Sequence, residues 1–269
     1  MRIALVSLNQ RWLDKDENFR RCDSFAREAA GHGCDLVVFP EMTLSGYSLD
    51  VAAIAEHEQG SESVQRFARL AADAGVDIIF GACLVHTASG KPRNYLCLAR
   101  RTGGAEAVYA KIHPFSFSGE DKVVEMGSAP CVLEAGGLHL GCSVCYDLRF
   151  PELFSPMAPG CDAMINIANW PAPRAAHWRA LLVARAIENQ WFALGVNRVG
   201  IDGNGLQYEK CSMAIAPDGT ILVPVISGPE MDVYEIDRED VTRYRKGFPT
   251  IRDKRYALYR DMMEASDAE

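Results

Sequence analysis

Short apolar, β-prone runs alternate with longer segments of helical periodicity along this chain, and that alternation restricts the fold more than any other feature. Residues Asp14 to Gly33 have apolar side chains at helical spacing, and the next run, Asp35–Phe39, is an apolar strand. The other predicted strands are 76–85, 95–99, 107–110, 138–144, 163–168 and 192–197, and the other predicted helices are 61–74 and 177–190. All-α and all-β chains lack this alternation, so we predict an α/β layered fold.

The chain is predicted to form one domain, residues 1–269. No Pro-, Gly- or Ser-rich linker divides it, and single α/β domains reach about 250 residues. A hairpin is predicted where Pro217-Asp-Gly219 separates the runs 213–216 and 220–225. The charged and aromatic tail from about residue 239 is predicted to be a C-terminal arm that packs on a surface.

Charge and cysteine usage exclude several classes of partner. The formal net charge is −8 and there is no basic patch or stripe, which argues against nucleic acid and anionic membrane surfaces. Residues Met1 to Leu8 form a short strand-like run without the longer apolar core and cleavage site of a signal peptide. The odd number of cysteines, nine, fits a reducing compartment, so a cytoplasmic protein is predicted.

Cys145 is the first candidate for chemistry. It follows the β-prone run 138–144 and precedes Pro151, a residue tolerated in a first helical turn, so a strand-to-helix turn should expose its sulfur. A nearby helix N-terminus favours the thiolate, which is a strong nucleophile. The other eight cysteines are interpreted as packing residues. Cys142 and Cys145 do not indicate a zinc site, because they face opposite sides of a strand and no second Cys/His pair completes the ligands.

Two more reactive side chains follow apolar strands. Glu41 comes directly after the run 37–40, and Lys111 comes directly after the run 108–110. Catalytic groups in open α/β sheets gather beyond the carboxyl ends of strands, where these two residues and Cys145 are predicted to lie. Each alone has an ordinary interpretation, Glu41 as a helix cap or loop acid and Lys111 as a surface lysine.

Together the three groups form a unit that can hydrolyse amides. Glu41 serves as general base for Cys145, and then for the water that splits the acyl-enzyme. Lys111 and the backbone N–H of Tyr146 hold the oxyanion of the tetrahedral intermediate. This mechanism requires no metal and no cofactor.

The segments that carry these residues resemble the catalytic motifs of the nitrilase superfamily of carbon–nitrogen hydrolases. They are Phe39-Pro-Glu-Met-Thr-Leu-Ser-Gly-Tyr47, Lys111-Ile-His-Pro-Phe115 and Cys145-Tyr-Asp-Leu-Arg-Phe-Pro-Glu152. Segments 169–173, 177–178, 184–190 and 196–204 are similar to the omega-amidase-like branch, so the resemblance covers nearly the whole chain. It implies a four-layer α-β-β-α sandwich and a homodimer formed through helices and C-terminal arms.

The resemblance implies an amidohydrolase for small amides of the 2-oxosuccinamate and 2-oxoglutaramate class, which releases ammonia through a cysteine thioester. Deaminated-glutathione amidase is a close alternative. N-carbamoyl amino acid hydrolases tend to carry two successive arginines after the nucleophile, whereas Leu148 precedes Arg149 here, and nitrilases usually have Trp in place of Tyr146. A papain-like site is less favoured, because neither His113 nor His177 has an orienting Asn or Asp assignable from the sequence. An inactive binding protein predicts loss of a catalytic residue, yet all three are present.

A second glutamate often assists in this family, between the lysine and the nucleophile. Glu120 is the best match, and its implied role is to orient Lys111 or the substrate. Glu125 competes, although Gly127 resembles the glycine that follows the family's second glutamate. The ordinary interpretation of Glu120 is a solvated loop acid.

The substrate pocket is predicted from residues near the three strand ends. Asn169 and Trp170 should line it, Tyr146 lies beside the nucleophile, and Phe115 and Phe117 are predicted to close its mouth.

An acid tail on the substrate requires a cation. Arg149, Arg174 and Arg198 are the candidates, because guanidinium groups pair bidentately with carboxylates. Each could instead be a structural partner of an acidic residue, namely Asp147, Glu152 or Glu188.

Overall fold

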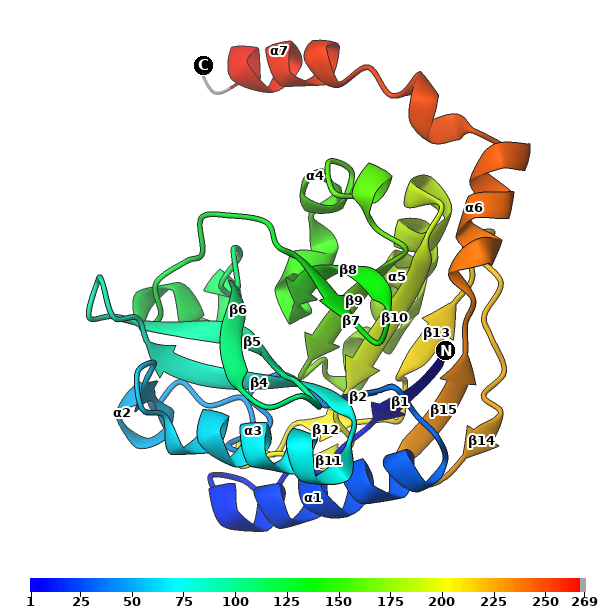
Figure 1. Ribbon diagram of the computed structural model, residues 1–269. Helices are drawn as coiled ribbons and strands as arrows, with labels where there is room; N and C mark the ends of the chain where they lie inside the picture. The colour runs from blue at the N-terminus through cyan, green and yellow to red at the C-terminus, as the bar shows by residue number, and fades with distance from the viewer. Residues whose placement is uncertain (267–269) are drawn as a thin grey trace.

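Two β-sheets form the centre of the computed structural model, which describes residues 1–266 (Figure 1). The first sheet has the order β14 (Ile226–Ser227), β15 (Met231–Glu235), β1 (Arg2–Val6), β2 (Leu36–Val38), β4 (Asp77–Val85), β5 (Pro92–Ala99) and β6 (Ala105–Ala110), with β3 (Glu56–His57) paired to β4. The second has the order β13 (Met213–Ile215), β10 (Phe192–Asn197), β9 (Ala163–Ala168), β8 (Leu138–Val144) and β7 (Val132–Ala135). A short ribbon joins β11 (Gly200–Ile201) and β12 (Gln207–Tyr208).

Helices cover the outer faces of the two sheets. The helices are α1 (Lys15–Gly31), α2 (Val51–Ile54), α3 (Glu62–Ala74), α4 (Pro151–Phe154), α5 (Ala175–Asn189), α6 (Arg238–Gly247) and α7 (Tyr256–Ser266). The 3₁₀ turns are η1 (Ser116–Ser118), η2 (Glu120–Lys122), η3 (Cys145–Arg149), η4 (Ala158–Gly160), η5 (Ala172–Arg174) and η6 (Thr250–Asp253). α1 and α3 pack on the first sheet, and α4 and α5 pack on the second (Figure 1).

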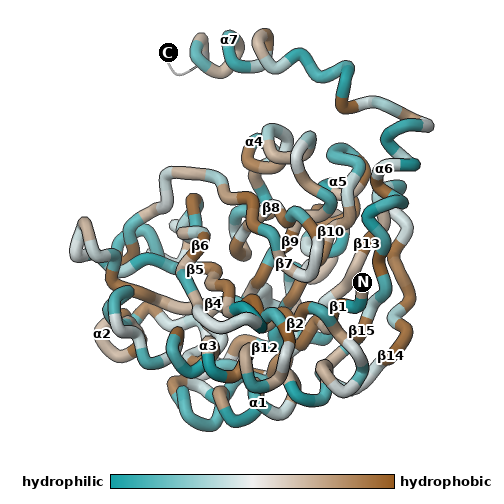
Figure 2. The backbone as a smooth tube through the Cα atoms, viewed as in Figure 1, coloured by the Kyte–Doolittle hydropathy of each residue, from teal (hydrophilic) through white to brown (hydrophobic). Residues whose placement is uncertain are grey.

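Three apolar clusters hold these layers together. The central cluster joins inward side chains of both sheets, such as Leu5 and Ile165, while a second lies under α1 and α3 around Phe67 and a third under α4 and α5 around Trp178. Figure 2 shows the hydrophobic residues concentrated on the strands between the helices. All six residues of β9 are buried, because this strand is covered on both faces. The implied four-layer α-β-β-α sandwich is therefore confirmed.

Strand direction gathers the candidate residues at one edge of each sheet. β1, β2 and β4 run parallel, and β6 is parallel to β4 because each is antiparallel to β5. β8, β9 and β10 also run parallel. Glu41 after β2, Lys111 after β6 and Cys145 after β8 consequently follow the carboxyl ends of their strands.

The predicted hairpin forms only in part. Its turn is present, with Gly219 at φ +90° and the Ala216 N–H bonded to the Thr220 carbonyl at 2.8 Å. Beyond it a single bridge joins Ile215 to Ile221. The predicted strand 220–225 stops there, because Pro224 has no N–H to donate to a ladder.

The C-terminal arm has two parts. α6 packs against the body, where Val241 is buried and Arg245 donates to the carbonyls of Ala158 and Asn189 at 2.9 and 3.2 Å. The Tyr256 hydroxyl reaches the Ser155 carbonyl at 3.0 Å, and beyond it α7 runs away from the sheets (Figure 1). The arm therefore packs on the body, as predicted, only as far as the start of α7. Residues 267–269 of the predicted domain lie outside the described residues.

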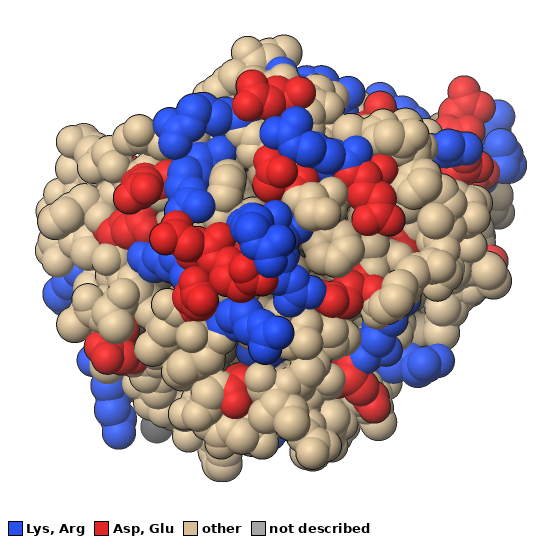
Figure 3. Space-filling model, turned by 90° about the horizontal axis from the view of Figure 1, so that it is seen from below, with Lys and Arg blue, Asp and Glu red and all other residues tan. Residues whose placement is uncertain are grey.

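Acidic and basic side chains are interspersed on the face that carries α1 and α3 (Figure 3). Ion pairs on this face explain the pattern, among them Arg20 with Glu17 and Arg27 with Asp23 along α1. No helix within residues 1–266 combines the length and apolarity needed to cross a membrane.

Candidate active site

Cys145 lies where β8 ends and the 3₁₀ turn η3 begins. Its φ is +48°, a left-handed conformation that non-glycine residues seldom adopt and that a tertiary framework must hold. The Val144 N–H is bonded to the Asp147 carboxylate at 2.9 Å, which closes the turn. The Cys145 Sγ lies 3.9 Å from the Asn169 carbonyl oxygen, its hydrogen-bond acceptor. The turn thus fixes the thiol beside the end of β9.

Asp147 joins this turn to the strand end that carries Lys111. Its fully buried carboxylate accepts from the Tyr109 hydroxyl at 2.8 Å, from the His113 N–H at 2.9 Å and from the His113 ring at 2.8 Å. These contacts come in addition to the bond from Val144. One carboxylate therefore fixes the ends of β6 and β8 relative to each other.

Lys111 is held between two carboxylates in the interior. Its Nζ lies 2.9 Å from Glu41 Oε1 and 2.8 Å from Glu120 Oε2, and the three side chains are at most 1% exposed. The Asn94 amide donates to Glu41 Oε1 at 2.7 Å and to Glu120 Oε1 at 2.9 Å. We call these four side chains the charged cluster. Each of its three charged groups has a polar partner within 3 Å, as buried charges require.

The pKa values of Lys111 and Glu120 favour their ionised forms. Burial alone would lower the pKa of the Lys111 ammonium, but the charges of Glu120 and Glu41 outweigh burial and raise it well above its usual value. Burial would likewise raise the pKa of Glu120, and Lys111 outweighs that effect and lowers it. Lys111 is therefore a fixed cation at the base of the site.

Close packing positions Glu41. A Cβ on Gly81 of β4 would lie 2.4 Å from the Met42 nitrogen, so only glycine lets the turn after β2 approach this strand. Glu41 Oε2 accepts from the Asn169 N–H at 3.0 Å, and the Asn169 amide donates to the Glu41 carbonyl at 2.7 Å. Asn169 thus contacts both the base candidate and the Cys145 sulfur.

The thiol itself is not activated in the free site. Burial raises the pKa of Cys145 well above its usual value and Glu41 raises it further, whereas Lys111 lowers it. The prediction of a resting thiolate is therefore wrong, because η3 is a single 3₁₀ turn beside two carboxylates rather than the start of a long helix. A protonated thiol needs a base during attack.

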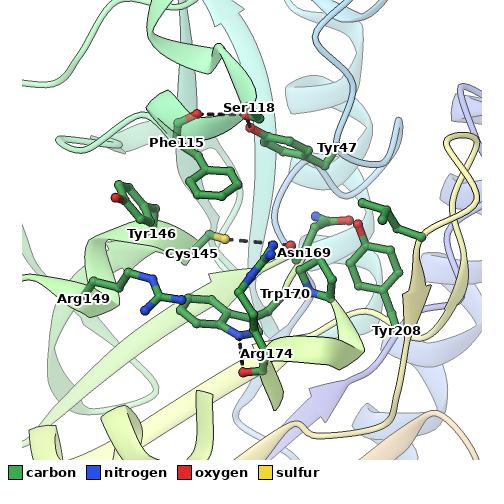
Figure 4. Close-up of a pocket in the computed structure, with 12 residues that line it drawn as sticks. Tyr47, Phe115, Ser118, Cys145, Tyr146, Arg149, Asn169, Trp170, Arg174 and Tyr208 are labelled. Atoms are coloured by element: carbon green, nitrogen blue, oxygen red, sulfur yellow. Dashed lines mark hydrogen bonds between the residues drawn. The ribbon is translucent and has the colours of Figure 1, made fainter. Parts of the chain in front are cut away.

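A small cavity of about 90 Å³ opens above Cys145 (Figure 4). Its walls are mainly aromatic, and they are made by Tyr47, Phe115, Tyr146, Trp170 and Tyr208. Ser118 and Asn169 add polar atoms, and Arg149 and Arg174 add two cations. A cavity of this size suits a substrate with few heavy atoms.

The structure separates the predicted residues into two groups. Tyr146, Asn169, Trp170, Arg149 and Arg174 line the cavity.

The other candidates lie elsewhere. Phe117 is 87% exposed and outside the cavity, because the η1 turn directs it to solvent while Phe115 points inward. Arg198 is fully buried under the Tyr208 ring, 4.7 Å from its centroid, and donates to backbone carbonyls. Glu125 pairs with Arg93 at 2.8 Å outside the charged cluster.

The papain-like alternative is not supported, although one of its two histidines has an orienting carboxylate. His113 has the orienting carboxylate, Asp147, that sequence reasoning did not find. Its ring stacks on Phe150 with centroids 3.8 Å apart and is not part of the cavity wall. His177 contacts Arg149 through its Nδ1 at 3.4 Å.

Sequence reasoning missed three residues of the site. Tyr47 lies within the motif 39–47, and its hydroxyl contacts Ser118 at 2.7 Å and Glu120 at 3.2 Å. Asn94 directly precedes the predicted strand 95–99, so a polar residue at that strand's start was the available signal. Tyr208 lies on the two-residue strand β12, which was not predicted, and its hydroxyl donates to Asp202 at 2.9 Å.

Within residues 1–266, no group of three or more His, Cys, Asp or Glu side chains is arranged to hold a metal ion.

Comparison with known proteins gives a consistent result. The family model for carbon-nitrogen hydrolase matches residues 2–246. Omega-amidase YafV of Escherichia coli (strain K12) is 34% identical over 255 residues, which cover 94% of this chain and 96% of that protein. The 2-oxoglutaramate amidase of Bacillus subtilis (strain 168) is 30% identical over 246 residues, covering 90% and 93%.

Solved structures agree in fold. A CN-hydrolase superfamily protein from Xanthomonas campestris, with an arsenic adduct in its active site, has a TM-score of 0.86 and 32% identity and covers 94% of this chain and 97% of its own. A double mutant of the amidase from Nesterenkonia sp. AN1, in complex with acrylamide, has a TM-score of 0.83 and 26% identity, with 97% of both chains covered. In another mutant of that amidase, the acetamide moiety of fluoroacetamide is added covalently to the active-site cysteine.

Proposed function

Because this chain belongs to the carbon–nitrogen hydrolase family, we propose that it hydrolyses the terminal amide of a short carboxylic acid, of the 2-oxosuccinamate and 2-oxoglutaramate class. The products are the dicarboxylate and ammonia. The observation that carries the proposal is the position of Cys145, on the wall of a small cavity and linked through Asn169 to the charged cluster. Two cations on the wall of the same cavity suit an acid tail.

In the first half of the reaction, the Cys145 sulfur attacks the amide carbon while Glu41 removes the thiol proton. The carbonyl oxygen becomes an oxyanion held by Lys111 Nζ and the Tyr146 N–H. Glu41 returns the proton to the amide nitrogen, the C–N bond breaks, and ammonia leaves a thioester on Cys145. The raised pKa of Cys145 makes this transfer to a neighbouring base necessary.

In the second half, water replaces ammonia. Glu41 takes a proton from the water, whose oxygen attacks the thioester carbon, and collapse of the intermediate breaks the C–S bond. The sulfur regains a proton and the carboxylate product leaves. No oxidant, reductant or co-substrate other than water is consumed.

Glu120 and Asn94 keep Lys111 in place. Glu120 accepts from Lys111 at 2.8 Å and from the Phe115 N–H at 2.6 Å. Asn94 spaces the two carboxylates by donating to both. Lys111 is thereby oriented before substrate arrives, which is how an oxyanion donor is most effective.

We also propose a homodimer in a reducing, cytoplasmic compartment. α7 carries half-exposed apolar residues, Leu258 and Tyr259 among them, that a second copy of the chain would cover. All nine cysteines are free thiols, which suits a reducing environment. Light scattering should give twice the chain mass, and deletion of residues 256–269 should reduce it to the monomer. A monomeric full-length chain contradicts this proposal.

Ammonia release tests the function directly. The panel comprises 2-oxosuccinamate, 2-oxoglutaramate, an N-carbamoyl amino acid, deaminated glutathione and a nitrile, each with wild type, Cys145→Ala and the matched control Cys83→Ala. Cys83 is buried away from the cavity. Fast turnover of the oxo-amides that survives in Cys83→Ala and disappears in Cys145→Ala supports the proposal. Preference for another member of the panel refutes the substrate class, and activity in Cys145→Ala refutes the mechanism.

A further inference from the structure

Two arginines face the cavity, and their surroundings differ. Arg149 stacks on Trp170, 4.7 Å from the ring centroid, and its guanidinium contacts His177 Nδ1 at 3.4 Å. The Arg174 guanidinium makes no hydrogen bond and no ion pair with any residue from 1 to 266, and it lies over the Phe115 ring, 5.6 Å from the centroid. Five N–H donors on a partly buried wall are therefore available to a ligand.

The structural alternatives for Arg174 are not realised. Glu188 is paired with Arg185 at 2.9 Å, and Asp147 is used by its own network. In a chain with 36 acidic and 28 basic residues, an arginine without a carboxylate partner at the edge of an apolar cavity is an unusual arrangement. It indicates that the partner is the substrate.

The backbone holds Arg174 in a fixed position. Its N–H donates to the Pro171 carbonyl at 3.0 Å, and its carbonyl accepts from the Trp170 indole at 2.8 Å. It also precedes the 15-residue helix α5, whose N-terminus adds positive potential. In Figure 4 its side chain extends from η5 toward the region of Cys145 and Phe115, whereas Arg149 extends over Trp170. These contacts hold the backbone from which the Arg174 side chain extends at the edge of the cavity.

The charge of the site determines where an anion can bind. The charged cluster holds two carboxylates and one ammonium, so its net charge is −1 while Cys145 is a thiol. An acid tail is repelled from that end of the cavity and attracted to the arginine wall. A substrate that spans the cavity therefore has its amide at Cys145 and its charge at the opposite end.

We propose that Arg174 is the residue that selects an acid amide, by pairing with the substrate carboxylate, while Arg149 holds the Trp170 wall. The proposal rests on the amidase function above and adds to it the single cation that determines specificity. It also limits the substrate length, since a cavity of about 90 Å³ leaves room for only a short chain between carboxylate and amide.

The first test compares two substrates of the same shape. Succinamate carries a carboxylate where succinamide carries a neutral amide. Replacement of Arg174 by methionine, Arg174→Met, removes the charge and keeps the length, and Arg179→Met is the control on an exposed position of α5. We expect Arg174→Met to lower kcat/KM for succinamate about a hundredfold, mostly through KM, and to leave succinamide within about threefold. Arg174→Lys should recover part of the loss, because it restores the charge but not the planar fork.

Three results overturn the proposal. One is an equal loss on both substrates in Arg174→Met with an unchanged melting temperature. Another is loss of discrimination in Arg149→Met instead of Arg174→Met. The third is a wild type that does not distinguish the two substrates.

A second test needs no turnover. Calorimetry measures binding of the product dicarboxylate, succinate, to Cys145→Ala and to Cys145→Ala/Arg174→Met. We expect the second variant to bind about a hundredfold more weakly. If no amide is hydrolysed by the wild type but this difference appears, the proposed function fails and the carboxylate site remains. If amides are hydrolysed and the two variants bind succinate equally, the function remains and the role of Arg174 is refuted.

Discussion

The charged cluster beneath the cavity and the cavity wall differ in how their charges are paired. In the charged cluster, Lys111 is fully buried and every ionised group has a partner within 3 Å. On the wall, Arg149 and Arg174 are partly exposed and neither has a carboxylate partner among the described residues. A closed network fixes geometry for chemistry, whereas an open cation is completed only by a ligand. Changes in the charged cluster should therefore lower catalysis, whereas changes in the two wall arginines should alter substrate binding.

Removing the central cation should have the largest effect. Lys111→Met leaves two buried carboxylates facing each other and removes an oxyanion donor, so we expect kcat/KM to fall by at least about a thousandfold and the free energy of unfolding by about 3 kcal/mol. Lys122→Met, at an exposed lysine nearby, is the control. The measurements are ammonia release and urea denaturation. Activity within tenfold of wild type would contradict the role of Lys111 in the charged cluster.

The pH dependence of Cys145 alkylation tests, without mutation, whether the nucleophile rests as a thiol that needs a general base. Because burial and Glu41 raise the pKa of Cys145, its thiolate fraction should still rise tenfold per pH unit from pH 7 to 9, and alkylation by iodoacetamide should accelerate about a hundredfold. Cys131, whose pKa is lowered by a hydrogen bond from Cys142, should depend less on pH. Peptide mass spectrometry separates the two sites. A Cys145 rate that levels off below pH 8 would show a resting thiolate.

Substitution of Glu120 and of Glu125 tests which of the two glutamates belongs to the charged cluster. Glu120→Gln removes one of the two charges on Lys111, and we expect about a thirtyfold loss of kcat with little change in KM. Glu125→Gln weakens contacts with Arg93, Ser89 and Lys91 outside the charged cluster and should leave activity within twofold. Steady-state kinetics on one oxo-amide decides between them. Equal effects would mean that neither glutamate acts through Lys111.

The ion pair of Glu120 with Lys111 predicts a pH dependence of the free energy of unfolding. The pKa of Glu120 is lowered in the fold, so its stabilisation is present above its unfolded pKa and is lost as pH falls through the folded value. The pKa of Lys111 is raised, so its stabilisation is present below its unfolded pKa and is lost as pH rises through the folded value. Stability should be level between about pH 5 and pH 10 as far as these groups determine it. In Glu120→Gln the acid limb should flatten.

Asp147 links the strand ends that carry Lys111 and Cys145, so its substitution tests whether this link is needed to position the catalytic groups. Asp147→Asn replaces an acceptor of four hydrogen bonds by an amide whose nitrogen cannot accept. We expect a loss of about 2 kcal/mol in the free energy of unfolding and about a tenfold lower kcat at unchanged KM. Asp121→Asn, at an exposed position, is the control. A change in KM alone would place Asp147 with the wall instead.

Strand-end reasoning predicted the reactive groups, and tertiary contacts decided the rest. Strand–helix alternation predicts parallel neighbours, as found for β1 with β2 and for β8 with β9, whose strands precede Glu41 and Cys145. β6, which precedes Lys111, instead takes the direction of β4 as the third strand of an antiparallel run. Asn94 could not be assigned, because its role depends on β5 lying between the ends of β2 and β6. The thiol's protonation also escaped prediction, since burial beside Glu41 is a property of the packed site.

Among aromatic and charged wall residues, sequence gave candidates but not directions. Phe115 ends the motif 111–115 and Phe117 lies two residues beyond it, and only the 3₁₀ turn shows which one faces the cavity. Arg149, Arg174 and Arg198 were equivalent by sequence, and burial under Tyr208 removes Arg198 from contact with a substrate.

The smallest expected effect separates the two remaining arginines. Arg149→Met removes a cation–π contact of about 0.5 to 1 kcal/mol with Trp170, so the wall loosens while Arg174 keeps its donors. We expect KM for succinamate to rise only about threefold, and KM for succinamide to rise equally, because a looser wall affects both substrates. Arg174→Met should instead separate the two substrates about a hundredfold. If Arg149→Met discriminates as strongly, the two cations act as one clamp, and the contrast between an engaged and a free arginine does not describe this wall.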